Sequence, residues 1–262
     1  MTNNTSKISP MNTEMSLTWF DSIDSTNSEA ARRISNIDKM AVFAAKYQTA
    51  GRGQRGNKWL SKAGDNLTFS IALQLGNEAL PKITPKEQFY ISIITTLAIC
   101  DYLRHCGIHP LIKWPNDIYV KNKKICGILI ENQLSGNKVS SSIIGIGLNL
   151  NQTEFAPELM NPTSIALLTS TKTTPEHALD TFLPFFIKRL DALSNAYGKS
   201  NAFKEFQQLM YRKDSSYPYR DCLSGKEFIG KIKGISAEGF LLMEMPDKSI
   251  QSFSFKEISY II

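Results

Sequence analysis

Apolar residues recur along the chain with two periods, and each period predicts its own kind of element. Short apolar or alternating runs that end at Gly, Pro, Asn or Asp are typical of strands. Such runs occupy residues 17–23, 40–47, 66–75, 111–114, 117–134 and 140–151. The run 117–134 breaks in its middle at "KNKK", so it is predicted to be a hairpin.

Longer stretches with apolar residues at helical spacing predict helices over 25–37, 85–107 and 175–213. The first is predicted to begin with a capping box from Thr26 to Glu29. The second has a proline at its start and a glycine at its end, which is the usual asymmetry of helix boundaries.

The composition changes near Asp214. From there to the end, four or five short strands are separated by Gly, Ser and Pro-Asp turns, enough for a small barrel of SH3 size. The sequence therefore predicts an α+β protein with a mixed β-sheet and helices. We expect a flexible N-terminal arm over 1–16, a main domain over 17–213 and a C-terminal SH3-like β-barrel over 214–262.

Composition and charge narrow the class of protein. The chain has 262 residues, of which 42% are hydrophobic and 21% charged, as in ordinary globular proteins. Its net charge of +6 favours acidic partners such as nucleotides, although a generally solvated basic surface explains it equally well. The N-terminus lacks the apolar core of a signal peptide, and no apolar run is long enough to span a bilayer. We expect a cytoplasmic protein without membrane contact.

The four cysteines show neither a C-x-x-C pair nor a metal-binding spacing, which favours free thiols in a reducing compartment. Cys100, His105, Cys106 and His109 lie close in sequence but straddle a predicted helix end and the turn after it. No metal site is predicted there.

The segment "YQTAGRGQRGNKWLS" (residues 47–61) contains a G-x-G-x-x-G with interleaved basic residues, a pattern that often approaches phosphate. A dinucleotide fingerprint requires a helix after the last glycine, and "NKWLSKAGDN" has no helical period. A P-loop requires Lys-Ser/Thr directly after Gly56, where Asn57 stands instead. A kinase loop requires H-R-D and D-F-G strings, which the chain lacks. All three alternatives fail.

Three further strings carry candidate chemistry. "DSIDSTNSEA" places Ser25, Thr26 and Asn27 at a strand-to-helix junction, where hydroxyls and amides serve either as helix caps or as ligand contacts. "KWPND" places Lys113 at the end of an apolar strand, where its ammonium must meet an anion or extend to the surface. "GIGLNLN" ends a strand with Gly145 and Gly147, so the backbone there must tolerate a close neighbour.

Taken in chain order, these strings resemble the biotin protein ligase family. The matching pieces are D-S-T-N (24–27), Y-Q-T-A-G-R-G (47–53), R-G-N-K-W (55–59), K-W-P-N-D (113–117), K-x-x-G-I-L-I-E (124–131) and G-I-G-L-N-L-N (145–151). The resemblance extends from about Leu17 to the end of the chain. It implies the biotin/lipoate ligase catalytic fold for 17–213 and a flexible adenylate-binding loop for the glycine-rich segment.

The family implies a two-step ligase reaction. The biotin carboxylate attacks the α-phosphorus of ATP, assisted by Mg²⁺, and gives biotinyl-5′-adenylate and pyrophosphate. A lysine amine on the biotin carboxyl carrier domain of a biotin-dependent carboxylase then attacks the mixed anhydride and releases AMP. Because carboxylate and phosphate repel each other, fixed cations must hold them together. Lys113 and Arg52 are the catalytic candidates.

The resemblance also implies which residues bind each substrate. For biotin they are Ser25, Thr26, Asn27, Gln48, Gly51, Arg52, Gly53, Lys113, Gly127 and Leu129. For ATP or the adenylate they are Arg52, Gly53, Gln54, Arg55, Trp59, Lys113, Asn116 and Asn149. No histidine lies within a matching motif, so acid–base catalysis by histidine is not implied.

The sequence departs from the family pattern in two places. Only a short polar arm precedes Leu17, so we expect the monofunctional type without an N-terminal DNA-binding domain and without DNA as a partner. Gln54 and Asn57 stand where relatives often have arginine, so this loop brings fewer positive charges to the phosphate of the intermediate. A monomer and a homodimer are both compatible with the sequence.

Two alternative functions remain at this point. A lipoate or octanoate ligase shares the fold, but a ureido ring needs several fixed donors and acceptors, which Ser25, Thr26 and Asn27 supply. A nucleic-acid-binding regulator would explain the basic charge, but it would need a helix-turn-helix before Leu17.

Overall fold

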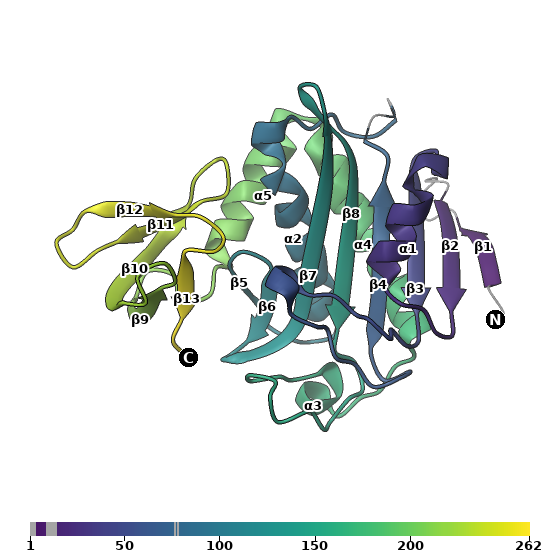
Figure 1. Cartoon of the computed structure of the whole chain (residues 1–262), viewed down its shortest axis with the longest axis horizontal. Coiled ribbons are helices and arrows are strands. Elements are labelled where there is room, and N and C mark those ends of the chain that lie inside the picture. Colours follow the sequence, from purple (N-terminus) through teal and green to yellow (C-terminus); the bar gives the residue numbers. More distant parts are fainter. Residues whose placement is uncertain (1–3, 9–14, 76, 78) are drawn as a thin grey trace.

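The chain folds into a large sheet covered by helices, with a smaller sheet attached at one end (Figure 1). The structure is a computed structural model that describes residues 4–8, 15–75, 77 and 79–262. The N-terminal and C-terminal ends of the described chain lie at opposite sides of the molecule in this view.

The large sheet has eight strands in the order β1-β2-β3-β4-β8-β7-β6-β5. Only β2 and β3 are parallel among these neighbours, so the sheet is mixed, as predicted. The strands are β1 (Asn4–Ile8), β2 (Met15–Phe20), β3 (Met40–Ala45), β4 (Leu67–Leu73), β5 (Leu111–Lys113), β6 (Asp117–Val120), β7 (Lys123–Ser135) and β8 (Lys138–Leu148).

Helices α2 (Phe89–His105), α4 (Pro175–Asp191) and α5 (Ala196–Gln208) cover one face of this sheet, behind it in Figure 1. Helix α2 is buried nearly all round because it packs against α4 and α5 as well as the sheet. Helix α1 (Thr26–Arg33) lies on the opposite face, over β3, β4 and β8. The remaining helical elements are α3 (Ile165–Thr169) and the short 3₁₀ turns η2 (Ile34–Asn36), η3 (Gln54–Gly56), η4 (Pro85–Glu87) and η5 (Ala192–Ser194).

Successive side chains of β4 alternate between the hydrophobic core and the α1 side of the sheet. Leu67, Phe69 and Ile71 join the main hydrophobic core, and the Phe69 ring meets Phe182 of α4 edge-to-face at 5.4 Å. The intervening Ser70 is fully buried on the α1 side of the sheet, where it contacts polar side chains. This side of the sheet is therefore available for a polar site.

The C-terminal segment forms an antiparallel sheet of five strands in the order β12-β11-β10-β9-β13, consistent with the predicted SH3-like module. The strands are β9 (Ser216–Asp221), β10 (Glu227–Ile235), β11 (Leu241–Glu244), β12 (Ile250–Phe253) and β13 (Ile258–Tyr260). The boundary near residue 213 stays a prediction, and it falls between the end of α5 and the start of β9.

Trp114 fastens this module to the large domain. Its indole N–H donates to the Gly239 carbonyl at 2.9 Å, and its ring lies 5.3 Å from that of Phe255. Phe255 also contacts Phe89 at the start of α2, at 5.7 Å between ring centroids. Trp114 precedes Pro115 in a cis peptide bond.

The predicted elements agree with the structure except at three places. The arm predicted over 1–16 contains a strand, β1, because its backbone pairs with the edge of β2, and such pairing leaves no apolar signature in a polar segment. Residues 1–3 and 9–14 of that arm lie outside the described residues. The helix expected from residue 85 begins as η4 and becomes α-helical only at Phe89, and α3 was not predicted.

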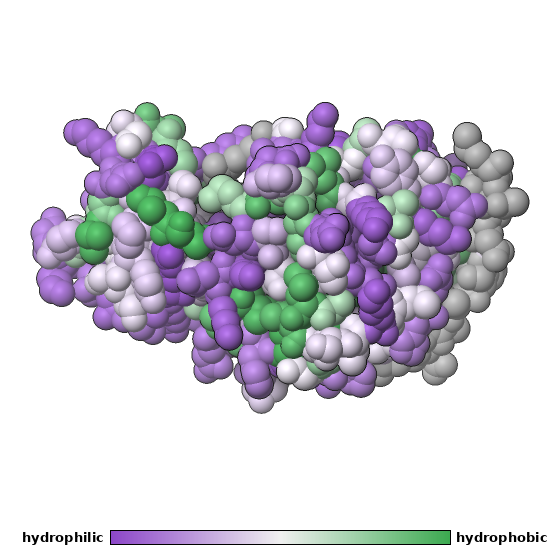
Figure 2. Space-filling view, turned by 90° about the horizontal axis from the view of Figure 1, so that it is seen from below, coloured by the Kyte–Doolittle hydropathy of each residue, from purple (hydrophilic) through white to green (hydrophobic). Residues whose placement is uncertain are grey.

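The surface seen from the side of α3 is mainly hydrophilic with small hydrophobic patches (Figure 2). Met160, Leu167 and Leu168, which lie before and within α3, are among the exposed large hydrophobic residues. Across the described ranges, each helix is too short or too polar to cross a membrane.

Candidate functional site

A row of residues in cross-strand register forms the floor of a pocket on the α1 side of the large sheet. Lys113 of β5 opposes Asp117 of β6, Asp117 opposes Gly127 of β7, and Gly127 opposes Gly147 of β8. All four residues line a pocket of about 280 Å³. Because directly opposed residues share a face, the two glycines leave a gap beside the charged pair.

The side chains of Asn27 and Trp59 occupy the space that these strands leave. A Cβ on Gly145 would lie within 3.0 Å of the Asn27 carboxamide, and one on Gly147 would lie within 3.0 Å of the Trp59 indole. Real Cβ atoms essentially never make contacts this short. The expectation that β8 must tolerate a close neighbour is confirmed, and the neighbours are these two side chains.

Three polar side chains, Ser25, Thr26 and Asn27, are buried at the N-terminus of α1, each 3% exposed. The Thr26 backbone N–H and hydroxyl both donate to Gln48 Oε1, at 2.8 and 3.1 Å. The predicted capping box is wrong: α1 begins at Thr26 itself, and Glu29 pairs with arginines on its own helix. The Thr26 hydroxyl contacts the Gln48 side chain instead, because Thr26 lies beside Gln48 at the strand-to-helix junction.

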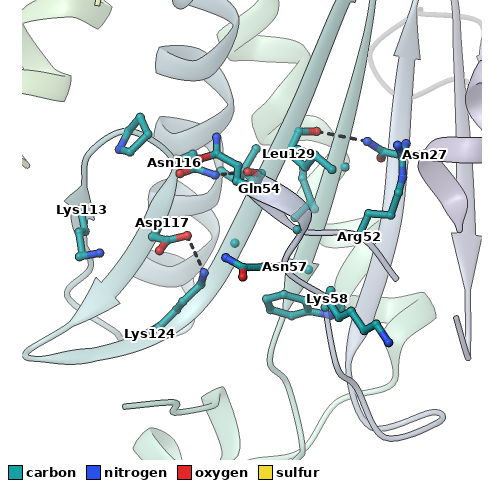
Figure 3. Close-up of a pocket in the computed structure, with 18 of the residues that line it drawn as sticks. Asn27, Arg52, Gln54, Asn57, Lys58, Lys113, Asn116, Asp117, Lys124 and Leu129 are labelled. Atoms are coloured by element: carbon teal, nitrogen blue, oxygen red, sulfur yellow. Dashed lines mark hydrogen bonds and ion pairs between the residues drawn. The ribbon is translucent and has the colours of Figure 1, made fainter. Parts of the chain in front are cut away.

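Ser70 extends this polar network beneath the helix. Its Oγ lies 2.7 Å from Thr26 Oγ1 and 2.6 Å from Asn27 Oδ1. On the other side of the carboxamide, Asn27 Nδ2 donates to Glu131 Oε2 at 2.8 Å. The same nitrogen faces the Leu129 carbonyl at 3.4 Å (Figure 3). These contacts fix the orientation of the Asn27 carboxamide, since its oxygen meets a hydroxyl and its amine meets a carboxylate.

Glu131 links this network to the glycine-rich loop. Arg52 Nη2 lies 2.7 Å from the same Glu131 oxygen that accepts from Asn27. The Arg52 and Glu131 side chains are 43% and 40% exposed, so the ion pair by itself contributes little stability. The ion pair matters because it fixes the position of the Arg52 guanidinium.

The glycine-rich segment folds back on itself instead of opening an α-helix. The backbone N–H of Trp59 donates to the Gly51 carbonyl at 3.0 Å, and the backbone N–H of Gly53 donates to the Asn57 carbonyl at 2.7 Å. The 3₁₀ turn η3 lies between Gly53 and Asn57. A Cβ on Gly51 would lie 2.6 Å from the Trp59 carbonyl oxygen, so this close return requires glycine. The segment is therefore a compact loop without the helix of a dinucleotide fingerprint.

Most of the loop residues singled out from the sequence line the pocket. Arg52, Gly53, Gln54 and Trp59 do so, whereas Gly51 stands behind Trp59. The Trp59 indole Nε1 is buried and has no hydrogen-bond partner among the described residues. The side chain of Arg55 lies outside the described part of the structure.

Two lysines reach the pocket from different strands. Lys113 is half-buried, and its Nζ lies over the rings of Tyr119 and Tyr260, 5.2 and 4.7 Å from their centroids. Lys124 Nζ pairs with Asp117 at 2.7 Å and lies beside Gly127. Figure 3 places Lys124 between Asp117 and Asn57 of the loop, whereas Lys113 stands apart from them.

The two asparagines singled out from the sequence have different surroundings. Asn116 lines the pocket, and its carboxamide donates to the Ile128 carbonyl of β7. Asn149 lies outside the pocket lining and is 5% exposed. Its Nδ2 donates to the Thr163 carbonyl at 2.9 Å, which holds the segment leading into α3 against β8.

The C-terminal module contributes Phe255 and the stretch 258–260 to the pocket wall. Burial raises the pKa of Tyr260 well above its usual range and also raises that of Tyr119, so both phenols are neutral beside Lys113. The Lys113 ammonium therefore lies over the aromatic faces of Tyr260 in this wall and of Tyr119 in β6.

Several pocket residues were missed from the sequence. Among them are Asn57, Lys58, Asp117, Lys124, Phe255 and the stretch 258–260. Asp117 and Lys124 stand at strand ends inside matching motifs, and that signal could have found them. The described lining contains four basic side chains, Arg52, Lys58, Lys113 and Lys124, against one acidic side chain, Asp117, so the pocket favours an anion.

Comparison with known proteins identifies similar chains. Residues 19–149 match the model of the biotin/lipoate A/B protein ligase family. The chain is 29% identical over 238 residues to the bifunctional ligase/repressor BirA of Salmonella typhimurium, covering 90% of this chain and 72% of that protein. It is 35% identical over 182 residues to the biotin–[acetyl-CoA-carboxylase] ligase of Paracoccus denitrificans, covering 67% and 72%.

The fold is also similar to solved structures. The biotin protein ligase from Aquifex aeolicus in complex with biotin and ATP superposes with a TM-score of 0.73 and 26% identity, covering 93% of this chain and 97% of that one. The fold is thus shared over almost the whole chain.

Proposed function

The chain belongs to the biotin/lipoate A/B protein ligase family, and on that premise we propose that it is a biotin protein ligase. It joins biotin and ATP into biotinyl-5′-adenylate and then transfers biotin to a lysine of a biotin carboxyl carrier domain. The observation that carries the proposal is the pocket, which combines buried uncharged polar groups with an excess of basic side chains.

The buried polar groups suit the ureido ring of biotin. Such a ring presents both N–H donors and a carbonyl acceptor, and a buried polar ligand needs fixed partners of both kinds. Thr26, Asn27, Gln48 and the neighbouring Ser25 supply hydroxyls and carboxamides. Thr26 is held by Gln48, and the Asn27 carboxamide is held by Ser70 and Glu131. A dithiolane ring has no N–H or carbonyl to form hydrogen bonds with these groups, which disfavours lipoate.

The basic side chains of the pocket suit the two reacting groups, the biotin carboxylate and the α-phosphate, because both are anionic. A biotin carboxylate oxygen attacks the α-phosphorus, and pyrophosphate leaves with the electrons of the broken P–O bond. Arg52, Lys113 and Lys124 would bring the two anions together and stabilise the charge that develops between them. Lys124 joins the predicted pair because it lies beside Gly127 and Trp59 in the centre of the pocket.

Mg²⁺ would accompany the nucleotide. This ion is usually held by substrate phosphates together with one or two carboxylates, and Asp117 is the carboxylate in the described lining. No group of three or more acidic, His or Cys side chains within the described ranges is arranged as a protein-only metal site. When bound, the ion would neutralise charge on the leaving pyrophosphate.

In the second step the carrier lysine, as a neutral amine, attacks the acyl carbon of the adenylate. The C–O bond to phosphate breaks, AMP leaves, and the amine nitrogen loses a proton as the amide forms. Trp59 would cover the adenylate, because its indole lies across Gly127 and Gly147 beneath the glycine-rich loop.

One experiment tests the proposal. The protein is incubated with ATP, Mg²⁺, a biotin carboxyl carrier domain and either biotin or lipoate, and the carrier is then weighed by mass spectrometry. We expect one biotinyl group on the carrier in the biotin reaction. A carrier modified only with lipoate would replace biotin by lipoate as the substrate, and an unmodified carrier in both reactions would contradict the ligase assignment.

A further inference from the structure

Glu131 of β7 stands just outside the pocket but holds two residues that line it. It follows Gly127 by four positions, so both face the same side of the sheet. Its side chain is absent from the described pocket lining, whereas Asn27 and Arg52 belong to that lining. Any effect of Glu131 on a ligand therefore passes through these two residues.

One carboxylate oxygen accepts from both partners. Glu131 Oε2 lies 2.8 Å from Asn27 Nδ2 and 2.7 Å from Arg52 Nη2. Asn27 is 3% exposed, and its other carboxamide atom already meets Ser70, so the carboxylate determines which way the amide faces. Arg52 belongs to the glycine-rich loop, and this contact joins the loop to strand β7.

The carboxylate also balances the charge of Arg52. An arginine paired with a carboxylate attracts a second anion less than an unpaired one does. Because the pair is partly exposed, the effect on an incoming anion is modest. Glu131 thus has two separable properties: its oxygen positions Asn27 and Arg52, and its negative charge compensates the charge of Arg52.

We propose that Glu131 is a positioning residue that couples the ring-binding end of the pocket to the glycine-rich loop. It orients the Asn27 carboxamide for the ligand ring and holds the Arg52 guanidinium beside it, while its charge moderates the attraction of Arg52 for the ligand carboxylate. This inference rests on the proposed function, since it assumes that the ligand is biotin.

The test separates the ring from the carboxylate by comparing two ligands. Binding of biotin and of biotinol, in which an alcohol replaces the carboxylate, is measured by calorimetry on the full chain. Glu131→Gln keeps an oxygen acceptor and removes the charge. Glu131→Ala removes both, and Glu131→Asp keeps the charge but withdraws the oxygen by one methylene.

We expect Glu131→Ala and Glu131→Asp to bind biotinol about tenfold more weakly, because the Asn27 amine loses the oxygen that accepts its hydrogen bond. Glu131→Gln should bind biotinol within about twofold of the wild type but bind biotin about two- to fivefold more tightly. The ratio of the two affinities therefore changes in Glu131→Gln, which a loss of packing alone would not produce.

The matched control is Glu227→Ala, which breaks the Arg220–Glu227 pair at the same 2.7 Å distance and at comparable exposure in the C-terminal module. Its affinities should equal those of the wild type. Biotinol binding by Glu131→Ala and Glu131→Asp at the level of this control would overturn the proposal, as would an unchanged affinity ratio in Glu131→Gln. A wild type that binds neither ligand would instead refute the proposed function, and the inference with it.

Discussion

At the scale of single residues, the site is a balance of charges around one carboxylate. Asp117 lies between Lys113, its cross-strand neighbour, and Lys124, its ion-pair partner. The Lys113 ammonium lies over the rings of Tyr119 and Tyr260, an aromatic environment that the sequence argument did not consider. Each lysine is positioned by a different contact, so each can be tested separately.

Replacing either lysine with alanine should slow adenylate formation. Removal of one preorganised cation aimed at developing charge typically lowers the rate by about 10²–10³-fold. We expect this of Lys113→Ala and of Lys124→Ala, both measured by biotin-dependent pyrophosphate release. Lys46→Ala, which breaks an exposed pair with Asp21, serves as the control. A folded variant that releases pyrophosphate at the wild-type rate would remove that lysine from the mechanism.

Gln54 offers a second prediction at this scale. It lines the pocket within the loop and brings an amide without charge. A hydrogen bond to an ionised group contributes about 1.5–3 kcal/mol when charge-assisted and about 1 kcal/mol otherwise. Gln54→Arg should therefore retain biotinyl-adenylate longer, by about tenfold for each 1.4 kcal/mol gained. The measurement is the release rate of the intermediate in the absence of carrier, and equal rates would show that Gln54 does not face the phosphate.

At the scale of elements, strand β8 supplies the space in which the site is built. Its glycines at 145 and 147 lie on the same face as Gly127 and allow a helix residue and a loop residue to press onto the sheet. Neither glycine has a left-handed backbone, so the requirement comes from close approach and not from conformation. The backbone conformation of the strand is therefore compatible with alanine, and only the neighbouring side chains oppose it.

Alanine at these two glycines should therefore damage different halves of the site. Gly145→Ala displaces the Asn27 carboxamide and should weaken biotin binding by about tenfold or more, as expected for a lost hydrogen bond to a buried group. Gly147→Ala displaces Trp59 and should weaken ATP binding while biotin affinity changes less. Calorimetric titrations with each ligand distinguish the two variants, and parallel losses for both ligands in both variants would refute this division.

At the scale of the whole molecule, the C-terminal module completes a pocket that the large domain begins. The KWPND segment serves both parts, since Lys113 and Asp117 line the floor while Trp114 binds the module. Gly239, which accepts from Trp114, has a φ of +93° and packs on the Phe89 ring, so both its backbone and its surroundings favour glycine. Tyr260 of the module lies beside Lys113 of the large domain.

Trp114→Phe tests this docking. The change keeps an aromatic ring but leaves the buried Gly239 carbonyl without its donor, at a cost of about 1–3 kcal/mol. We expect a lower melting temperature and slower pyrophosphate release, with biotin affinity close to that of the wild type because the ring-binding residues belong to α1 and its neighbours. A variant that binds biotin as poorly as it turns over ATP would contradict the separation of these roles.

The sequence by itself determined the order of elements and the identity of the site motifs. Strands, long helices and the small C-terminal sheet follow from local apolar periods, and the need for glycine in "GIGLNLN" was already visible. These features are encoded within a few residues of one another, which is why a single sequence reveals them.

Only the tertiary structure decided which groups meet. The sheet order puts β8 between β4 and β7, and this register brings Ser70 and Glu131 to the Asn27 carboxamide from strands far apart in sequence. The strand β1 and the partners of Thr26 escaped prediction for the same reason, since backbone pairing and side-chain competition depend on neighbours that no local pattern specifies. Long-range register thus determined the geometry of a site whose residue types were written locally.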